Sequence, residues 1–413
     1  MVARMSDIQS NSASLKTNRP RIAIAGGGIG GLALAVALAR RSYAPVVYER
    51  KPLDQIRSEG AFLTLAPNGI NALRALGLAE AVIAAGLETR GLALFNEHGR
   101  RLAVVDYAAH RRQYGAPSVT VRRGALGAIL LDAAIAAGIE LRSATGIEDV
   151  ELERDAVSVH ASGTARYDAL IACDGLRSRV RRRLFPELPE PRYSGLIGTG
   201  GVVEVDGIAP TDGLMNMTFG RRGFFGYIAE PGQPVMWFNS YPAPIDAIGQ
   251  PADPQAYARY IETLHLGDPL DNARIMAAVP AIERHYPIFD MPDLARWSRG
   301  RVLLMGDAAH AVAPHSGQGA SMAVEDAVVL AALFDDADGV QQAFARFFAL
   351  RHDRAQAAIR VGRAAGQQKG AQGWLQLRLR DLVLPLVMPL AARAQARLFA
   401  FRADQAPLAQ PVQ

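Results

Sequence analysis

Cysteine is almost absent from this sequence, and the absence excludes two kinds of structure. Cys173 is the single cysteine among 413 residues, so neither an intrachain disulfide nor a cysteine-ligated zinc site can form. The eight histidines show no HxxxH-type spacing that would suit another metal. We therefore expect no metal site and a chain that works in the reducing cytoplasm.

Long hydrophobic runs are scarce as well. Residues 1–19 are polar and lack the apolar stretch of a signal peptide, so we interpret them as a flexible tail ahead of Pro20. The most membrane-like stretch, Leu382 to Leu390 (LVLPLVMPL), contains two prolines and is too short to span a bilayer. A helix docked on the protein is favoured there, and contact with a membrane surface stays open as the alternative.

Clustered positive charge is missing, although the chain is basic with a net charge of +5 and a pI near 9.5. The cations are nearly all arginines and are scattered, apart from the run between Arg177 and Arg183. Nucleic-acid binding needs a concentrated stripe of charge, so no nucleic-acid partner is expected. With 50% apolar and 21% charged residues, the composition is that of a globular protein, and the length exceeds that of one compact domain.

The first motif that is present is GGGIGG at residues 26–31, between a buried-strand pattern and a helix pattern. Gly26, Gly28 and Gly31 satisfy GxGxxG. In that motif the first glycine permits a tight turn, the second admits backbone amides to a pyrophosphate, and the third lets helix and strand pack closely. A flexible turn is the alternative, but Glu49 ends the next apolar run and is placed to bind ribose hydroxyls. We infer a dinucleotide site, with NAD and FAD both possible at this point.

Further along the chain, strand and helix patterns alternate before the texture changes to short β-type runs with glycine turns at 192–241. After them come another buried strand at 301–305, a glycine-rich loop, and a chain that is helical in period to about residue 402. The expected helices are 32–40, 67–76, 125–137 and 319–334, and the expected strands include 139–150, 156–161 and 168–172.

Two later motifs decide between the two dinucleotides. One runs from Tyr167 to Arg181 (YDALIACDGLRSRVR), and the other runs from Gly300 to His310 (GRVLLMGDAAH) and continues to Pro314 and GQG at 317–319. Together with GGGIGG, and in this order, they resemble the single-component flavin aromatic hydroxylases. These are the group-A FAD-dependent monooxygenases whose type member is p-hydroxybenzoate hydroxylase. The resemblance covers residues 20–365.

The resemblance implies FAD as the cofactor and NADPH or NADH as a transient co-substrate. NAD(P)H would reduce FAD, and the flavin C4a-hydroperoxide formed with O2 would hydroxylate or epoxidise an aromatic or polycyclic small molecule. The alternative is a flavin-binding protein that sequesters a metabolite, or oxidises or reduces it without oxygen insertion. The intact Asp174-Gly175 region argues against this alternative, because a protein without a nicotinamide partner need not keep it. The partners would be the substrate and O2, in a monomer or homodimer.

The implied architecture is α/β, with a Rossmann-like FAD-binding domain, an inserted, mainly antiparallel substrate-binding sheet and a helical C-terminal segment. The FAD-binding domain would be discontinuous, because its motifs stand on both sides of the sheet. The expected boundaries are 1–19 for the tail, 20–185 with 290–365 for the FAD-binding domain, 186–289 for the sheet domain and 366–413 for the C-terminal segment.

The resemblance also implies roles at matched positions. Glu49 would hold the adenosine ribose, Arg123 the FAD diphosphate or its neighbourhood, and Asp307 the ribityl or pyrophosphate region. Asp174 would serve both FAD and the passing nicotinamide nucleotide, while Ala125 stands where the family commonly has an acid. The expected cofactor contacts are Gly26, Gly28, Ile29, Gly30, Gly31, Glu49, Arg50, Arg123, Asp174, Gly175, Gly306, Asp307, Pro314, Gly317, Gly319 and Ala320.

The loop 314–319 should border the flavin ring, because the helix that follows would direct backbone amides and a positive dipole end at it. His315 in this loop is the acid-base candidate, with an exposed loop histidine as the alternative. For His310 a structural role is favoured over a catalytic one, and for Cys173 a buried filler is favoured over a reactive thiol. The expected substrate contacts on the inserted sheet are Met215, Phe225, Tyr227 and Trp237, with an ordinary core face as the alternative.

Overall fold

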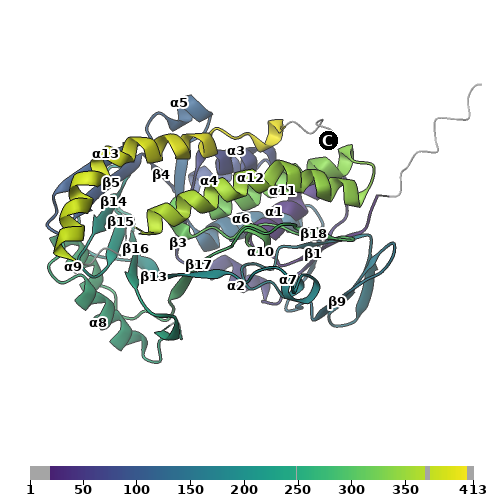
Figure 1. Cartoon of the computed structure of the whole chain (residues 1–413), viewed down its shortest axis with the longest axis horizontal. Coiled ribbons are helices and arrows are strands. Elements are labelled where there is room, and N and C mark those ends of the chain that lie inside the picture. The colour runs from purple at the N-terminus through teal and green to yellow at the C-terminus, as the bar shows by residue number, and fades with distance from the viewer. Residues whose placement is uncertain (1–18, 248, 368–372, 407–413) are drawn as a thin grey trace, which may run out of the picture.

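The computed structural model describes residues 19–247, 249–367 and 373–406 (Figure 1). All but the last residue of the expected tail, 1–19, falls outside this part of the chain. A mainly parallel six-stranded sheet and a seven-stranded sheet form the body of the molecule, and helices pack on both. The expected mixed α/β class is therefore confirmed.

The six-stranded sheet has the order β18-β19-β12-β1-β2-β8. Every neighbouring pair is parallel except β18 and β19. β1, β12 and β19 are buried along their whole length, as continuous apolar runs in a parallel sheet covered on both faces are. The strands are β1 (Ile22–Ala25), β2 (Val46–Tyr48), β8 (Glu140–Arg142), β12 (Ala169–Ala172), β18 (Ser298–Arg299) and β19 (Val302–Leu304).

The helices that carry the motifs pack closely on one another. α1 follows the glycine motif and packs against α6 and α11, and a Cβ added at Gly30 would lie 3.4 Å from the Cβ of Ala323. Small residues thus let α1 and α11 approach each other. The four helices expected from the sequence are confirmed, to within a few residues. The main helices here are α1 (Ile29–Ala39), α3 (Pro67–Ala75), α6 (Arg123–Ala136), α11 (Gly319–Asp336) and α12 (Val340–Gln367).

The seven-stranded sheet has the order β17-β13-β16-β15-β14-β5-β6. The run β13 to β16 is antiparallel as expected for 192–241, whereas β14 pairs with β5 in parallel. The strands are β5 (Gly91–Asn96), β6 (Arg101–Asp106), β13 (Arg192–Val203), β14 (Leu214–Phe219), β15 (Phe224–Ile228), β16 (Val235–Pro242) and β17 (Tyr286–Asp290).

The range expected for the sheet domain, 186–289, does not include β5 and β6. These two strands come from residues 91–106, inside the range expected for the FAD-binding domain. The physical reason is that β14 would otherwise be an edge strand, and β5 supplies the backbone partners that its outer side needs. Such a long-range pairing leaves no local pattern in the sequence.

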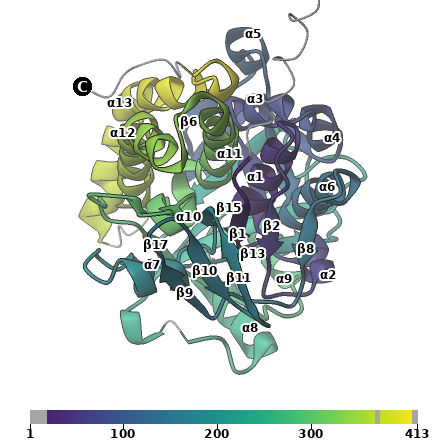
Figure 2. The ribbon, with the colours of Figure 1, turned by 90° about the vertical axis from the view of Figure 1, so that its right-hand side faces the viewer.

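The helices α8 and α9 cover one face of the seven-stranded sheet, and α13 packs on its edge strand, β6. Two small sheets complete the fold, and β9, β10 and β11 stand in front in Figure 2. Among the described residues no single helix is long and apolar enough to cross a membrane, although two stretches, Gln376–Met388 and Ala392–Phe399, bent by 44°, would be so together. The remaining elements are β3 (Phe62–Leu65), β4 (Leu87–Thr89), β7 (Ser118–Arg122), β9 (Asp149–Leu152), β10 (Val157–His160), β11 (Thr164–Tyr167), α2 (Leu53–Ser58), α4 (Ala79–Ala84), α5 (His110–Tyr114), α7 (Arg179–Leu184), α8 (Pro254–Leu264), α9 (Leu270–Ala277), α10 (Asp307–His310), α13 (Trp374–Phe399) and the 3-10 turns η1 (Ile245–Ala247), η2 (Pro314–Ser316) and η4 (Ala403–Gln405).

Candidate functional site

The three sequence motifs meet at one edge of the six-stranded sheet. β1, β12 and β19 are neighbours in register, with Ala25 opposite Ala172 and Ala172 opposite Leu304. Because these strands run in parallel and end level, the loops that follow them start side by side. Those loops carry GGGIGG, Asp174-Gly175 and Gly306-Asp307. Ligands of open α/β sheets bind at this carboxyl edge.

Glycine is present at three positions of GGGIGG for different geometric reasons. Gly26 has a φ of +101°, and a Cβ there would lie 2.5 Å from the carbonyl oxygen of Cys173. A Cβ on Gly31 would lie 1.9 Å from the carbonyl oxygen of Gly26, so only glycine permits this contact between α1 and the turn that follows β1. A Cβ on Gly28 would meet no atom within 4 Å. Gly28 therefore leaves open the side from which a ligand can approach the backbone.

Glu49 closes the glycine loop from the end of β2. Its Oε2 accepts a hydrogen bond from the backbone N–H of Gly27 at 2.7 Å, and its Oε1 accepts one from the N–H of Lys51 at 2.8 Å. Both oxygens keep lone pairs for further donors. This geometry suits the predicted binding of ribose hydroxyls.

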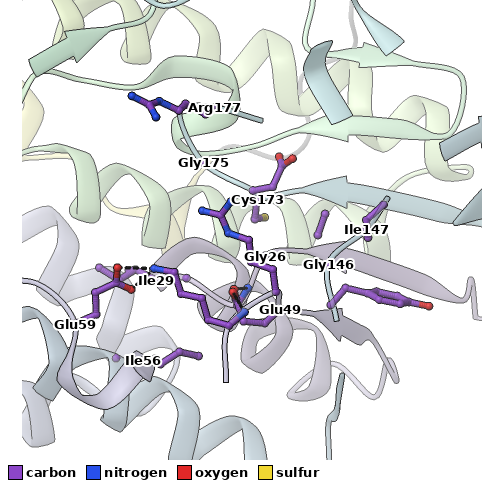
Figure 3. Close-up of a pocket in the computed structure, with 18 of the residues that line it drawn as sticks. Gly26, Ile29, Glu49, Ile56, Glu59, Gly146, Ile147, Cys173, Gly175 and Arg177 are labelled. Atoms are coloured by element: carbon purple, nitrogen blue, oxygen red, sulfur yellow. Dashed lines mark hydrogen bonds and ion pairs between the residues drawn. The ribbon is translucent and has the colours of Figure 1, made fainter. Parts of the chain in front are cut away.

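A pocket of about 250 Å³ lies among these loops (Figure 3). Its cationic lining consists of Arg50, Lys51, Arg123, Arg177 and Arg179, and Lys51 forms an ion pair with Glu59. The N-terminus of α1 also begins here, at Ile29. The lining also includes the acids Glu49, Glu59 and Asp174. Backbone N–H groups at a helix start, with five cations nearby, would suit a diphosphate.

Eight of the expected cofactor residues line this pocket: Gly26, Gly28, Ile29, Glu49, Arg50, Arg123, Asp174 and Gly175. The expected residues that do not line it are Gly30, Gly31, Gly306, Asp307, Pro314, Gly317, Gly319 and Ala320. Sequence reasoning missed other lining residues, including Lys51, Ile56, Glu59, Gly127, Gly146 and Ile147. For Lys51 the signal was its place directly after Glu49-Arg50, whereas the others come from elements without a motif.

Asp174 is fixed by the start of α7. Its Oδ2 accepts hydrogen bonds from the backbone N–H groups of Arg179 at 2.8 Å and Val180 at 3.2 Å. Its Oδ1 is buried and has no hydrogen-bond partner in the described residues. Burial raises the pKa of the carboxyl group above its ordinary value in spite of these bonds. A buried acceptor without a partner is costly, and a donor from a bound ligand would relieve that cost.

Cys173 lines the same pocket next to Asp174. Burial and the neighbouring carboxylate raise the pKa of its thiol well above the ordinary value. The thiolate is therefore disfavoured near neutral pH, which suits a filler better than a nucleophile.

Gly306 turns the chain sharply after β19, with a φ of +60°. The turn leaves Asp307 exposed, while the next three residues, Ala308 to His310, are buried. Desolvation by the protein atoms around its carboxyl group raises the pKa of Asp307, although the charges of His310 and Arg123 act in the opposite direction.

His310 belongs to a buried ionic network beneath the loops. Its Nε2 lies 2.6 Å from Oδ2 of Asp326, whose Oδ1 accepts a hydrogen bond from Arg351 at 2.7 Å. Arg351 donates a second bond, 2.6 Å long, to Glu325. The Asp326 carboxylate is held in the charged form, because the attraction of His310 and Arg351 outweighs burial and lowers its pKa. This network supports the structural role expected for His310.

The same network reaches the loop 314–319. The Asn68 side-chain amide donates to Glu325 at 2.6 Å and to the side-chain oxygen of Gln318 at 3.0 Å. Gln318 precedes α11 and is completely buried. The buried charges therefore hold both the Gly306-Asp307 loop and the GQG loop in place.

His315 is half-buried in this loop, in contrast to the exposed histidine considered as the alternative. Its ring lies beside α12, where a Cβ added to Gly366 would come within 2.7 Å of the ring carbon Cδ2. Gly317 adopts a φ of +62° beside the backbone of β3. The acid-base role of His315 stays a prediction.

The large sheet has two different faces. Phe225, Tyr227 and Trp237 point into a core shared with α8 and α9. Met215 lies on the opposite face, where the cluster also includes Met236, Phe238 and Phe62 of β3. Phe225, Tyr227 and Trp237 are buried under helices on the side away from β3, which favours the ordinary core face given as the alternative over substrate contacts. Met217 and Phe238 lie on the other face.

The residues of the pocket fit FAD. Its diphosphate needs cations and backbone amides, its ribose needs acceptors such as Glu49, and the partnerless oxygen of Asp174 needs a donor. Gly28 is the place where the backbone is open to such a ligand.

Comparison with known proteins agrees with this geometry. The family described as "FAD binding domain" matches residues 19–360. The chain is 32% identical over 366 residues to aurachin C monooxygenase/isomerase of Stigmatella aurantiaca, covering 87% of this chain and 93% of the relative. It is 30% identical to 6-hydroxynicotinate 3-monooxygenase of Bordetella bronchiseptica, covering 84% and 91%.

The fold also matches a solved structure of Klebsiella pneumoniae HpxO complexed with FAD and uric acid. The TM-score is 0.80 and the sequence identity is 25%, over 92% of this chain and 96% of the other. The Stigmatella and Bordetella relatives are monooxygenases, so a flavin-binding protein without oxygen insertion is not favoured. The chain belongs to the group-A FAD-dependent aromatic monooxygenases, the p-hydroxybenzoate hydroxylase-like enzymes that use NAD(P)H and O2.

Proposed function

We propose that this monooxygenase hydroxylates an uncharged, flat aromatic molecule such as a fused-ring phenol or nitrogen heterocycle. The observation that carries the proposal is the sheet face that includes Met215, Met217, Met236 and Phe238. These four side chains are apolar. One cation, Arg380, lies over the ring of Phe219 in the same cluster at 5.4 Å, and it is already paired with Glu97 and Asp381. A substrate carboxylate would need a cation for its burial, and the charge of Arg380 is already balanced by these two acids.

One polar atom adds to that face. Ser240 follows Phe238 by two residues on β16, so the two side chains point to the same face of the sheet. Its Oγ is buried and makes no hydrogen bond within the described part of the chain. This hydroxyl is suited to a neutral polar substituent on an otherwise apolar ring.

The division of labour follows from the geometry. FAD, when bound, takes electrons from NAD(P)H and activates O2 for transfer of one oxygen atom to the ring. Arg123 and the amides after β1 would hold its diphosphate, Glu49 its ribose, and Asp307 the region beyond. The start of α11 at Gly319 would place a positive dipole end toward the flavin ring.

The residue roles are tested by retention of FAD. Asp307→Ala should release FAD during gel filtration. The control, Asp335→Ala, removes an exposed carboxylate that is paired with Arg41 and does not line the pocket, so this variant should retain FAD. Equal retention by both variants would contradict the role of Asp307.

The substrate proposal is tested with two panels of compounds. Fused-ring phenols, quinolones and indoles should stimulate NAD(P)H oxidation and gain one oxygen atom by mass spectrometry, whereas benzoates and salicylate should not. Stimulation by benzoates alone would overturn the proposal. Phe238→Leu should raise KM for the substrate found, while Phe225→Leu, on the opposite face of the same sheet, should lower stability without that change in KM.

For the domains, we propose the expected boundaries with residues 91–106 reassigned to the sheet domain. The pairing of β5 with β14 supports this change. The cytoplasmic location and the monomeric or homodimeric state remain predictions from the sequence.

A further inference from the structure

The C-terminal helix α13 has an apolar stripe that faces away from the protein. Leu384 is buried and packs in a cluster with Phe219 and Phe224 of the large sheet. Leu382 and Leu386, on another side of the helix, are 69% and 71% exposed. The sequence favours a helix that packs on the rest of the protein, and this packing accounts for only one side of α13.

The stripe has helical spacing. Leu379 and Val383 are also exposed, and together with Leu382 and Leu386 they follow the i, i+3, i+4, i+7 pattern of a single helix face. An apolar face of this kind on a helix normally packs against the protein core or another apolar surface. No described residue covers these side chains to the extent that would make them buried.

A second element adds apolar residues. Leu266 and Leu270 stand in and after the loop between α8 and α9 and are 63% and 66% exposed. Among the large apolar side chains of the described residues, the most exposed are therefore Leu266, Leu270, Leu379, Leu382 and Leu386. We call these five residues the leucine patch.

The turn between β5 and β6 connects the two elements of the leucine patch. Arg380 of α13 donates a hydrogen bond of 2.8 Å to Glu97 in this turn. A Cβ added at Gly99 in the same turn would lie 3.5 Å from Pro269, which precedes Leu270. α13 and the α8–α9 region accordingly share one end of the molecule, which Figure 1 shows around the α9 label.

The turn between β14 and β15 belongs to the same end. Arg380 also donates to the carbonyl oxygen of Phe219 at 3.2 Å, and a Cβ on Gly220 would lie 2.7 Å from the carboxylate of Asp268. This turn continues with Arg221 and Arg222, both of which are exposed.

Charges at this end are sorted by sign. Three acids at this end are turned inward, with side-chain exposures of 9% for Glu97, 4% for Asp268 and 13% for Asp381, while Glu262 and Asp271 are half-buried. Glu97 and Asp381 are paired with Arg380, and Asp268 is paired with His265. The exposed charges of these segments include the arginines Arg100, Arg221, Arg222 and Arg378. Exposed leucines and exposed arginines on connected segments, with the acids of these segments buried or half-buried, complement an anionic surface that has an apolar interior.

We propose that this end of the enzyme docks on the surface of a membrane that contains anionic phospholipids. The leucine patch enters the headgroup boundary and the arginines contact lipid phosphates, so the protein lies on the bilayer and does not cross it. Each exposed arginine near an anionic surface strengthens binding by about fivefold. Because the inner side of α13 packs on Phe224 beside the proposed substrate face, docking would bring that face close to the bilayer.

The test is co-sedimentation of the FAD-loaded enzyme with vesicles. Wild-type enzyme should sediment with vesicles of phosphatidylglycerol and phosphatidylcholine, and much less with phosphatidylcholine alone or in 0.5 M NaCl. Leu382→Ser with Leu386→Ser should lower the partition coefficient at least tenfold. Arg221→Gln with Arg222→Gln should lower it on anionic vesicles only.

The matched control replaces exposed apolar residues elsewhere, Ile135→Ser with Ile245→Ser, and should bind as wild type does. All variants should keep the visible flavin spectrum, which shows that they are folded and loaded. Absence of wild-type binding to anionic vesicles would overturn the proposal, as would equal binding by the leucine variant. A wild-type dimer that the leucine variant converts to a monomer, without vesicle binding, would assign the patch to a second copy instead.

Discussion

Gly28 separates cofactor binding from folding, and a Gly28→Val variant tests this separation. The backbone at Gly28 has φ −74° and ψ −173°, a conformation that valine adopts without strain. No atom lies within 4 Å of an added Cβ, so the valine side chain would project into the pocket and not into the protein. The free energy of unfolding of the apoprotein should therefore change by no more than about 1 kcal/mol, the difference expected at a helix N-cap.

FAD binding by Gly28→Val should suffer much more. The valine would keep the diphosphate from the backbone amides, and losing two charge-assisted hydrogen bonds of about 1.5 kcal/mol each removes about 3 kcal/mol of binding free energy. The Kd for FAD should rise at least about 150-fold. Titration of apoprotein with FAD, followed by flavin fluorescence, measures the Kd, and urea denaturation of the same sample measures stability.

Two other glycines serve as controls. Gly31→Ala should destabilise the apoprotein itself, because its Cβ would lie 1.9 Å from the Gly26 carbonyl oxygen. Gly163→Val, in a turn where an added Cβ meets no atom within 4 Å, should change neither quantity. An FAD Kd for Gly28→Val within threefold of wild type would refute the reasoning, and so would a loss of apoprotein stability as large as that of Gly31→Ala.

Other predictions concern buried groups. Burial lowers the pKa of His110 to about 4. Histidine in an unfolded chain titrates near 6.5. The neutral form of His110 therefore contributes stability above pH 6.5, and this stability is lost as the pH falls toward 4. The unfolding free energy should drop by about 3 kcal/mol over that interval, and by less in His110→Gln. Asp326→Asn should cost about 3 kcal/mol or more in urea denaturation, because it breaks a buried ionic network, whereas Asp335→Asn at exposed pairs should cost less than about 1 kcal/mol. Because burial raises the pKa of the Cys173 thiol well above its ordinary value, native apoprotein should react slowly with a thiol reagent at pH 8 and rapidly in urea; equal rates would contradict this.

Much of the nucleotide-binding part could be predicted because its signals are local. The glycine motif, the acid at Glu49 and the strand patterns around Asp174 and Asp307 each lie within a short segment. Parallel pairing then brings the segments together at one edge of the sheet. The prediction of the helices succeeded for the same reason, since caps and periodicity are local properties.

The rest depended on contacts between distant segments. Alternation along β15 and β16 divides the side chains into two faces, but it does not say which face α8 and α9 will cover. The sequence therefore does not decide between the face that contains Trp237 and the face that contains Phe238. The pairing of β5 with β14 was missed on the same grounds, because its cause lies in the unsatisfied edge of a strand more than a hundred residues away.

The central position of β12, between β1 and β19, has a consequence for synthesis of the chain. One side of β12 can pair with β1 as soon as both have left the ribosome, but its other side must wait for β19. Leu304 is made roughly 130 residues after Ala172, which at about 5–20 residues per second leaves that apolar strand edge open for about 7–26 s. The nascent enzyme therefore passes through a stage in which aggregation competes with folding, and the Gly306-Asp307 loop completes the cofactor edge only after that stage ends.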